Sequence, residues 1–395
     1  MVIKYIPRLL EKPLLSIAKQ FPVIVLTGPR QTGKSTLLKK VFPKYNYVSL
    51  DNLAQRTEAR RDPSLFLENI GAPVIIDEIQ YAPDLLSYIK MTVDADRGKN
   101  GQFILTGSQM FPLMAGVSES LAGRVALFEL LGLSWEELAH VKRDSVVQCF
   151  KQIYQGFYPY LCTHENVSLN EYYGGYLTTY LERDIRQIRS VHDTSMFHIF
   201  LQMLATRAGN LLNLAEISKE CGISHATARN WLSLLETTRV VYLLRPYFRN
   251  MSKRLVKSPK LYFTDTGLLA HILKYQDAQT LATGPMAGAF FENMVVIEML
   301  KRKFNHRRLY EMYFYRDSNK NEVDLLLDLG QQRFALAEIK MTKNPRPDMA
   351  QVFSRLPKEL ETAERYVLSF SEDKINLSKD VKAIPWWEFI AGHDY

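Results

Sequence analysis

The sequence predicts an α/β protein in which two α/β units flank a helical region. In the first third of the chain, short apolar runs alternate with amphipathic stretches, which is typical of a parallel sheet covered by helices. These runs are residues 23–27, 47–51, 74–77, 103–106 and 125–130. Residues from about 135 to 210 favour helix. Strands are expected again near residues 310–315, 323–329 and 333–339.

The composition is that of a globular protein with more than one domain. A length of 395 residues predicts two or three domains, at about 150 residues each. With 19 glycines and 17 prolines the chain is neither collagen-like nor of low complexity. The net charge of +8 is compatible with an acidic partner.

The spacing of the cysteines and the length of the apolar runs predict the cellular compartment of the protein. Cys149, Cys162 and Cys221 form no C-x-x-C spacing, so we expect neither a disulfide framework nor a zinc knuckle. Charged residues interrupt the N-terminus before a signal-peptide core could form, and no run of about 18 apolar residues follows. We therefore expect a reduced, cytoplasmic protein that does not use a membrane.

A phosphate-binding loop is the most specific motif. Residues 28–35 match G-x-x-x-x-G-K-[ST], with an apolar strand before them and a helical stretch after them. The two glycines let backbone N–H groups surround phosphates, Lys34 reaches the β- and γ-phosphates, and Ser35 binds Mg²⁺. The expected cofactors are ATP and Mg²⁺. The residues expected to hold the nucleotide are Gly28, Pro29, Arg30, Gln31, Thr32, Gly33, Lys34, Ser35 and Thr36.

Residues at the ends of later strands suit the same chemistry. Asp77 ends an apolar strand and is expected to bind Mg²⁺, while Glu78 is expected to orient and deprotonate the attacking water. Thr106 and Ser108 follow another strand and are candidates to contact the γ-phosphate or that water. Arg124 is a candidate to stabilise transition-state charge, in its own site or a neighbouring subunit's. The alternatives are solvated acids, an ordinary turn and a surface arginine.

Residues 214–236 have the pattern of two helices joined by a tight turn. Gly222 supplies the turn, and Ser224 is placed to cap the second helix. The outer side of that helix carries residues able to face a major groove, namely Ser224, His225, Thr227, Arg229 and Asn230. The alternative is a structural or protein-binding winged helix.

The next stretch is basic. Residues 237–264 contain no acids and seven basic residues: Arg239, Arg245, Arg249, Lys253, Arg254, Lys257 and Lys260. A basic hairpin with interleaved aromatics is suited to neutralising phosphates. The expected partner is therefore nucleic acid, in the form of DNA, bound through residues 224–264. The alternative is a solvated hairpin packed on the first domain.

A second group of acids lies near the C-terminus. Glu338 and Lys340 are two apart and share one face of a strand, and Asp324 lies on an adjacent strand. Asp324 and Glu338 are candidate Mg²⁺ ligands, Lys340 a candidate to position water, and Glu292 a further carboxylate from a helix. This arrangement is typical of metal-assisted phosphodiester hydrolysis. The alternative is a domain whose acids are salt-bridged and which no longer cuts.

Nine stretches together carry a family resemblance: residues 26–35, 75–80, 105–108, 121–124, 181–185, 257–267, 291–293, 322–324 and 338–340. Over nearly its full length the chain resembles the prokaryotic AAA-type P-loop ATPases fused to a C-terminal winged-helix and restriction-endonuclease-like region. The resemblance implies ATP binding, ATP hydrolysis and a sheet with the phosphate-loop strand near its centre. One departure is Gly156-Phe157-Tyr158-Pro159, where the family often has Gly-Gly before an aromatic-Pro pair.

The expected domains are an AAA-type P-loop ATPase core at 1–135, a helical extension at 136–195, a winged-helix module at 196–285 and a restriction-endonuclease-like domain at 286–395. We expect an ATP-hydrolysing protein that acts on nucleic acid, forms a homo-oligomer through its ATPase domain and carries a candidate Mg²⁺-dependent nuclease. The alternative is a nucleotide-controlled switch whose nuclease-like domain is an inactive binding fold.

Overall fold

The computed structural model describes residues 5–96, 98–108, 117, 120–181, 194–247 and 258–392. The chain forms two compact units. The N-terminal unit comprises Met1–Leu133 with the short pieces Thr237–Arg239 and Phe304–His306. The C-terminal unit comprises Ser134–Glu236, Val240–Lys303 and Arg307–Tyr395.

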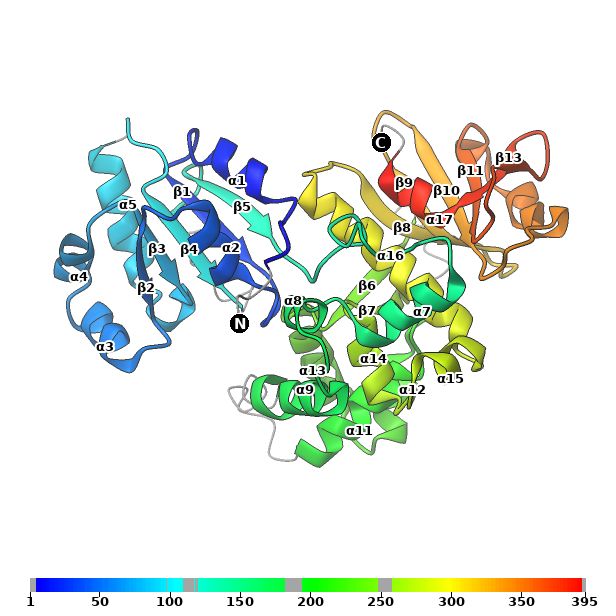
Figure 1. Cartoon of the computed structure of the whole chain (residues 1–395), viewed down its shortest axis with the longest axis horizontal. Helices are drawn as coiled ribbons and strands as arrows, with labels where there is room; N and C mark the ends of the chain where they lie inside the picture. Colours follow the sequence, from blue (N-terminus) through cyan, green and yellow to red (C-terminus); the bar gives the residue numbers. More distant parts are fainter. Residues whose placement is uncertain are drawn as a thin grey trace. The chain divides into compact units, whose positions relative to one another are not determined.

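The N-terminal unit is built on a five-stranded parallel sheet with the strand order β2-β3-β4-β1-β5 (Figure 1). Its strands are β1 (Val23–Thr27), β2 (Asn46–Ser49), β3 (Val74–Asp77), β4 (Phe103–Gly107) and β5 (Val125–Glu129). All five match the predicted apolar runs, which confirms the α/β fold class. The phosphate-loop strand β1 lies between β4 and β5, next to the central strand β4, in agreement with the expected position near the centre of the sheet.

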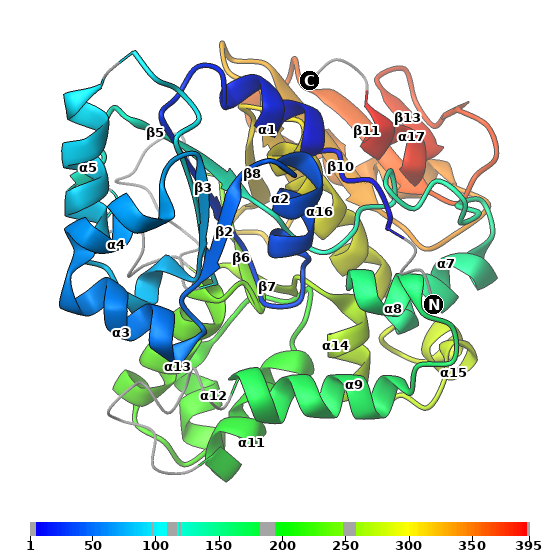
Figure 2. The ribbon, with the colours of Figure 1, turned by 60° about the vertical axis from the view of Figure 1, so that its left-hand side comes forward.

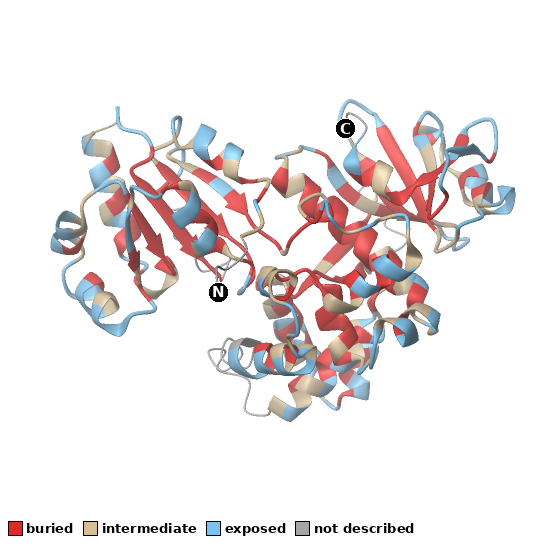
Figure 3. Cartoon of the chain, in the orientation of Figure 1, coloured by how far each residue is buried: buried red, intermediate tan, exposed pale blue. Residues whose placement is uncertain are grey.

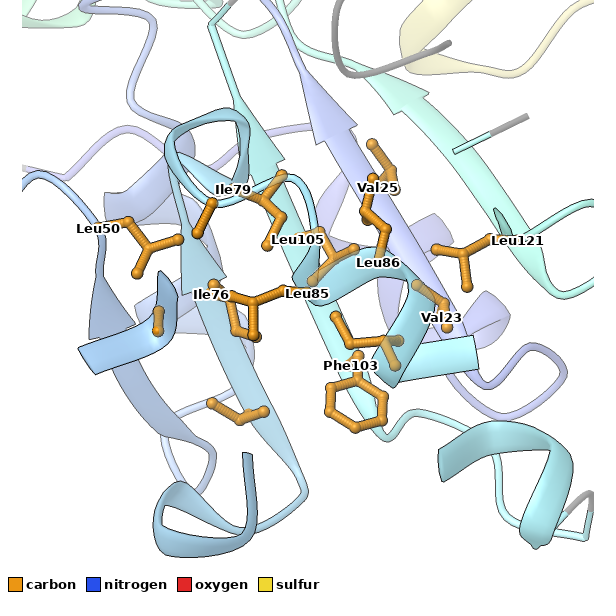
Figure 4. Close-up of a cluster of buried hydrophobic side chains, with 14 of the residues drawn as sticks. Val23, Val25, Leu50, Ile76, Ile79, Leu85, Leu86, Phe103, Leu105 and Leu121 are labelled. Carbon is orange, nitrogen blue, oxygen red and sulfur yellow. The ribbon is translucent and has the colours of Figure 1, made fainter. Parts of the chain in front are cut away.

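Helices cover both faces of this sheet. They are α1 (Glu11–Ile17), α2 (Lys34–Val41), α3 (Leu53–Arg61), α4 (Pro63–Ile70) and α5 (Leu85–Ala95). Successive β1 residues point to opposite faces. Val23 and Val25 pack with α3, α4 and α5, as Figure 4 shows for part of this cluster. Ile24 and Leu26 pack with α1 and α2. Strands β1, β3 and β4 are buried on both faces, which explains their continuous apolar runs, whereas the edge strands β2 and β5 carry exposed residues.

The C-terminal unit begins with helices, as predicted for residues from about 135. They are α7 (Val146–Gln155), α8 (Pro159–Thr163), α9 (Leu169–Tyr176), a π-helical turn (Leu177–Leu181), α11 (Thr194–Ala205), α12 (Leu214–Glu220) and α13 (His225–Thr237). Further helices follow the first hairpin: α14 (Thr266–Ile272), α15 (Ala278–Thr283), α16 (Ala287–Asn305) and the terminal α17 (Trp386–Ala391). Figure 2 shows these helices from a second direction.

An eight-stranded mixed sheet runs through the C-terminal unit in the order β12-β13-β11-β10-β9-β8-β6-β7. Its strands are β6 (Val241–Pro246), β7 (Lys260–Phe263), β8 (Glu311–Arg316), β9 (Glu322–Asp328), β10 (Phe334–Ile339), β11 (Glu364–Ser369), β12 (Ile375–Asn376) and β13 (Val381–Pro385). The β6–β7 hairpin was expected in a module ending at residue 285. It joins the later strands instead, because β6 pairs in parallel with β8. The pairing satisfies backbone groups that an isolated hairpin would leave open.

The core of the C-terminal unit lies on both sides of this sheet. One face of the sheet packs against the 3₁₀ helix Pro347–Arg355 through an apolar cluster that includes Leu336, Phe353 and Val367. Helix α16 is buried along much of its length, and the inner strands of both sheets are buried, whereas the edge strands β2 and β12 are largely exposed (Figure 3). Within the described residues, no helix has the length and apolar character needed to cross a membrane.

Candidate functional site

The phosphate loop lies between β1 and α2, at the carboxyl edge of the parallel sheet. Gly28 has φ 142° and Gly33 has φ 86°, both in the region that favours glycine. A Cβ at Gly28 would lie 2.1 Å from the carbonyl oxygen of Leu130, so no larger residue fits there. Helix α2 begins at Lys34 directly after the loop. The loop therefore has the tight cradle and the helix N-terminus that a phosphate group requires.

Lys34 is buried against its own loop. Its Nζ donates to the carbonyl oxygens of Gly28 at 2.9 Å and of Pro29 at 2.8 Å. Burial lowers the pKa of Lys34, and the Glu78 and Asp77 carboxylates oppose that shift. The ammonium thus lies within the loop and near both strand-end acids.

Three hydroxyl groups hold the Asp77 carboxylate. Ser35 Oγ donates to Oδ2 at 2.8 Å, and Tyr47 Oη donates to the same oxygen at 2.6 Å. Thr106 Oγ1 donates to Oδ1. The Lys39 ammonium lies 3.6 Å from the centre of the Tyr47 ring. The structure therefore brings Ser35, Asp77 and Thr106 together, as expected, and adds Tyr47, which no motif indicated.

Glu78 is held by the next strand. Its backbone is left-handed, with φ 58°, and its N–H donates to Thr106 Oγ1 at 3.1 Å. Its Oε2 accepts from the Ser108 N–H at 3.3 Å and from the Ser108 hydroxyl at 3.2 Å. Gln80 Nε2 also donates to this oxygen. Thr106 and Ser108 thus contact the acids directly, and Gln80 is a further contact that sequence reasoning missed.

Arg8 supports the loop from a segment outside the motif. Its guanidinium donates to the carbonyl oxygen of Thr32 at 2.9 Å and of Leu131 at 2.8 Å. A weaker bond reaches Gly132 at 3.3 Å. The side chain is buried although it is charged. No spacing rule could find this residue, because it precedes the loop by twenty positions.

Arg124 lies away from the phosphate loop of its own chain. It precedes β5, whose first residue pairs with Val23 at the start of β1. The loop follows the other end of β1, about 15 Å away at roughly 3.3 Å per strand residue. The guanidinium pairs with Asp94 on α5, with Nε 2.7 Å from Oδ1 and an amino group 3.0 Å from Oδ2. The structure does not bring Arg124 to the other candidate ATPase residues.

Helices α12 and α13 are joined by a turn at Gly222, which has φ 66°. Ser224 caps α13, because its Oγ accepts from the Thr227 N–H at 3.0 Å. The buried side of α13 includes Trp231, which packs edge-on against Phe197 and Phe200. Of the five residues expected on its outer side, Thr227 is half-buried. The other four are exposed: Ser224, His225, Arg229 and Asn230.

Lys260 on β7 lies among acids. Its Nζ is 2.7 Å from Glu322 Oε1, 3.0 Å from Glu292 Oε1 and 3.1 Å from Asp324 Oδ1. Tyr262 Oη also donates to Glu292 Oε1, at 2.7 Å. We call these five residues the Lys260 cluster. The expectation that Lys260 serves a phosphate-binding hairpin is wrong, because the side chain is only 3% exposed and is paired with carboxylates. Four of the other basic residues, Arg249, Lys253, Arg254 and Lys257, lie outside the described residues.

Glu338 and Lys340 adjoin this cluster. Strands β9 and β10 are antiparallel, and the Ile339 N–H donates to Asp324 Oδ2 at 3.0 Å. Lys340 Nζ lies 2.6 Å from Glu338 Oε1. The other oxygen, Glu338 Oε2, is buried without a hydrogen-bond partner. The structure therefore gathers Glu292, Asp324, Glu338 and Lys340, and it also places Lys260 between Glu292 and Asp324.

Burial dominates the electrostatics of this region. Burial, together with the nearby Asp324 carboxylate, raises the pKa of Glu292 to about 7 and that of Glu338 to about 8. Burial lowers the pKa of Lys260, but the surrounding acidic groups outweigh it and raise that pKa above its usual range. Among the residues that the structure describes, no group of three or more His, Cys, Asp or Glu side chains is arranged to hold a metal ion.

Three family descriptions match successive parts of the chain. An AAA domain matches residues 20–139. A domain of unknown function, DUF8612, matches residues 148–279, and another, DUF4143, matches residues 287–389. The AAA match covers the sheet, the phosphate loop and the acids at its edge.

Two mycobacterial proteins are similar over most of their length. Uncharacterized proteins of Mycobacterium tuberculosis and Mycobacterium bovis are each 32% identical over 372 residues, which is 92% of this chain and 80% of theirs. An uncharacterized protein of Haemophilus influenzae is 22% identical over 312 residues, which is 71% of this chain and 75% of that protein.

Solved structures resemble the chain more distantly. A Walker-type ATPase of Pyrococcus abyssi has a TM-score of 0.43 at 14% identity, covering 68% of this chain and 96% of that one. A DNA replication initiation factor has a TM-score of 0.27 at 14% identity, covering 75% of this chain and 92% of that one.

Proposed function

We propose, from the premise that this chain belongs to the family of its mycobacterial relatives and carries an AAA-type P-loop ATPase domain, that it couples ATP hydrolysis to action on nucleic acid. The observation that carries the ATPase assignment is the contact of Ser35, from the phosphate loop, with Asp77 at the end of β3. These groups, one at the start of α2 and the other at the end of β3, are the ones that suit a Mg²⁺–nucleotide complex.

Each residue at the carboxyl edge of the parallel sheet would have its own role in ATP hydrolysis. Lys34 would exchange the loop carbonyls for the β- and γ-phosphate oxygens of ATP, and Ser35 and Asp77 would hold Mg²⁺. The bound ion neutralises charge on the phosphates. Glu78 accepts a proton from the attacking water, in a position kept by Ser108 and Gln80. Loss of the Lys34 side chain, in Lys34→Ala, should abolish nucleotide binding measured by calorimetry; unchanged affinity would refute the site.

We assign the nucleic-acid contact to a winged helix whose reading helix is α13. Two features support it: the exposed side of α13 carries Arg229 and Asn230, and Arg245 on β6 is also exposed. Lys260 is excluded from this surface by its burial, and Arg239 by its pairing with Glu129 within the N-terminal unit. Of the seven basic residues between positions 237 and 264, Arg239 and Lys260 would therefore not contact DNA phosphates.

DNA binding measured against salt concentration, with and without ATP and Mg²⁺, tests this assignment. Arg229→Ala should lower affinity and flatten the slope of log affinity against log salt by about one unit if it contacts a phosphate. Arg61→Ala, an exposed arginine of α3 in the other unit, is the matched control. Equal loss in both variants would mean that only the overall charge matters.

We further propose that the ATPase domain forms a homo-oligomer in which Arg124 serves the neighbouring subunit's site. Its place at the amino edge of the sheet supports this, because the nucleotide loop of the same chain lies at the opposite edge. Mixing Arg124→Ala with Lys34→Ala protein should restore part of the ATPase activity, since each supplies what the other lacks. No recovery in mixed oligomers would remove the assignment.

A second candidate is a nucleotide-controlled switch whose C-terminal domain binds without cutting. The observation that favours it is the Lys260 ammonium among the acids expected to serve a nuclease. Cleavage through Asp324, Glu338 and Lys340 stays a prediction. Comparing Mg²⁺-dependent nicking by the unaltered chain, Asp324→Ala and Lys340→Ala separates the two functions. Equal nicking rates in all three proteins would exclude the nuclease and favour the nucleotide-controlled switch.

A further inference from the structure

The acids of the Lys260 cluster would ordinarily require a cation, and the chain supplies one itself. We propose that the Lys260 ammonium is the resident cation of the C-terminal carboxylate site and takes the place that a divalent metal ion would fill. The domain would then keep its acids together without Mg²⁺. This inference concerns the C-terminal unit alone and does not depend on the ATPase or on nucleic-acid binding.

The geometry around Lys260 is that of a coordinated cation. Three carboxylate oxygens, from Glu292 on α16 and from Glu322 and Asp324 on β9, lie 2.7–3.1 Å from a single nitrogen atom. The ammonium group donates hydrogen bonds to Glu292 Oε1 and Asp324 Oδ1 and forms an ion pair with Glu322. Lys260 reaches them from β7, which is separated from β9 in the sheet by β8 and β6. Its ammonium therefore joins α16 to the sheet.

Each of the two residues expected to bind metal already pairs with a lysine ammonium group. Asp324 uses Oδ1 for Lys260 and Oδ2 for the Ile339 N–H. Glu338 uses Oε1 for Lys340, which leaves Oε2 as its one buried acceptor without a partner. Mg²⁺ needs near-octahedral oxygen ligands at about 2.0–2.1 Å. The residues as arranged do not fit that ion, because the metal would have to displace an ammonium from the same oxygens.

The charges of the region are nearly balanced without a metal. Four carboxylates, those of Glu292, Glu322, Asp324 and Glu338, face three cationic groups, those of Lys260, Arg316 and Lys340. Buried charges are tolerated when they are paired in this way. Removing Lys260 would leave Glu292 and Asp324 without their shared cation, beside Glu322, which keeps its pair with Arg316. These carboxylates would then be open to a divalent ion.

Metal titration of the full chain without nucleotide tests the proposal, with Mn²⁺ as the probe and electron paramagnetic resonance as the readout. The unaltered chain and Asp324→Asn should bind the same amount of Mn²⁺. Lys260→Met should gain one Mn²⁺ site, which Lys260→Met/Asp324→Asn should lose. Lys340→Met is the matched control, a second lysine of the region, and should gain none. Lys260→Arg, which keeps a cation in place, should also gain none.

Two results would overturn the proposal. One is Mn²⁺ bound by the unaltered chain and lost in Asp324→Asn, because the site would then already take a metal. The other is folded Lys260→Met that gains no Mn²⁺, because the acids would then form no metal site at all. If Lys260→Met does not fold, the thermal unfolding temperature decides: Ca²⁺ should raise it in Lys260→Ala and leave it unchanged in the unaltered chain. A Ca²⁺ effect of equal size in both proteins would also refute the proposal.

Discussion

Tyr47 Oη donates a hydrogen bond to Asp77 Oδ2, the oxygen that also accepts from the hydroxyl of Ser35. The tyrosine comes from β2, an edge strand of the sheet, and the Lys39 ammonium lies over one face of its ring. The Asp77 carboxylate is thereby held from a strand outside the phosphate loop. Asp77 is thus fixed in orientation independently of Ser35, which remains able to turn toward a metal ion.

Tyr47→Phe removes this hydrogen bond and keeps the ring under Lys39. A hydrogen bond to a charged group is worth about 1.5–3 kcal/mol, so we expect roughly a tenfold or larger fall in kcat/KM for ATP. The concentration of Mg²⁺ for half-maximal activity should rise as well. Steady-state ATPase assays at varied Mg²⁺ measure both. Tyr45→Phe is the control, and a loss of kcat there of equal size would point to a general effect on the sheet.

Glu78→Gln keeps the size of the side chain and removes the base. General-base catalysis contributes about 10²–10⁴-fold, so hydrolysis should slow by that order while ATP binding persists. Single-turnover hydrolysis and filter binding of labelled ATP distinguish the two effects. Product release at the unaltered rate would show that Glu78 does not accept the proton.

Arg8→Lys tests support of the loop from outside the motif. A lysine ammonium cannot reproduce the forked contacts that the guanidinium makes with Thr32 and Leu131. We expect the N-terminal unit to lose about 2 kcal/mol or more of stability, and ATP affinity to fall. Urea unfolding and nucleotide titration are the measurements. Arg61→Lys, at an exposed position of α3, should change neither.

Asp265 stabilises the C-terminal unit near the start of α14. Its carboxylate accepts from the N–H groups of Phe157 at 2.7 Å and Leu268 at 2.9 Å, and from Tyr173 Oη at 2.8 Å. Asp265→Ala would leave the buried N–H groups of Phe157 and Leu268 without this acceptor, at about 1–3 kcal/mol each, whereas Tyr173 Oη keeps the Gln155 carbonyl as an acceptor. We expect a loss of about 3 kcal/mol or more in the free energy of unfolding. A loss below 1 kcal/mol in urea unfolding would contradict this role.

The same residue predicts a pH dependence. Burial raises the pKa of Asp265 above the ordinary value of 3.8. Between that value and the higher pKa of the folded state, the folded unit keeps a proton that the unfolded chain releases. The free energy of unfolding should therefore fall as pH rises through this interval. Asp265→Asn cannot titrate and should lack this part of the slope, which urea unfolding at several pH values between 4 and 7 measures.

Local sequence patterns predicted the fold class and some of the residues of each candidate site. The apolar runs located all five strands of the N-terminal sheet, and those of β1, β3 and β4 are continuous because these strands are buried on both faces. The glycines of the phosphate loop and the two-residue spacing of Glu338 and Lys340 also follow from chain geometry over a few residues. Tyr47, Arg8 and Gln80 carried no such signal, since what makes them relevant is a contact with a residue on another segment.

By itself the sequence determined the α/β class, the phosphate loop, the strand-end acids and the position of the C-terminal acids, because each depends on residues adjacent in the chain. Only the tertiary structure decided where three basic residues lie. Arg124 lies at the sheet edge opposite the loop, Arg239 pairs with Glu129, and Lys260 is buried among carboxylates. Charge counted along the chain does not reveal this. An ion pair forms wherever folding brings opposite charges together, and the fold sets that place over separations of up to 110 residues.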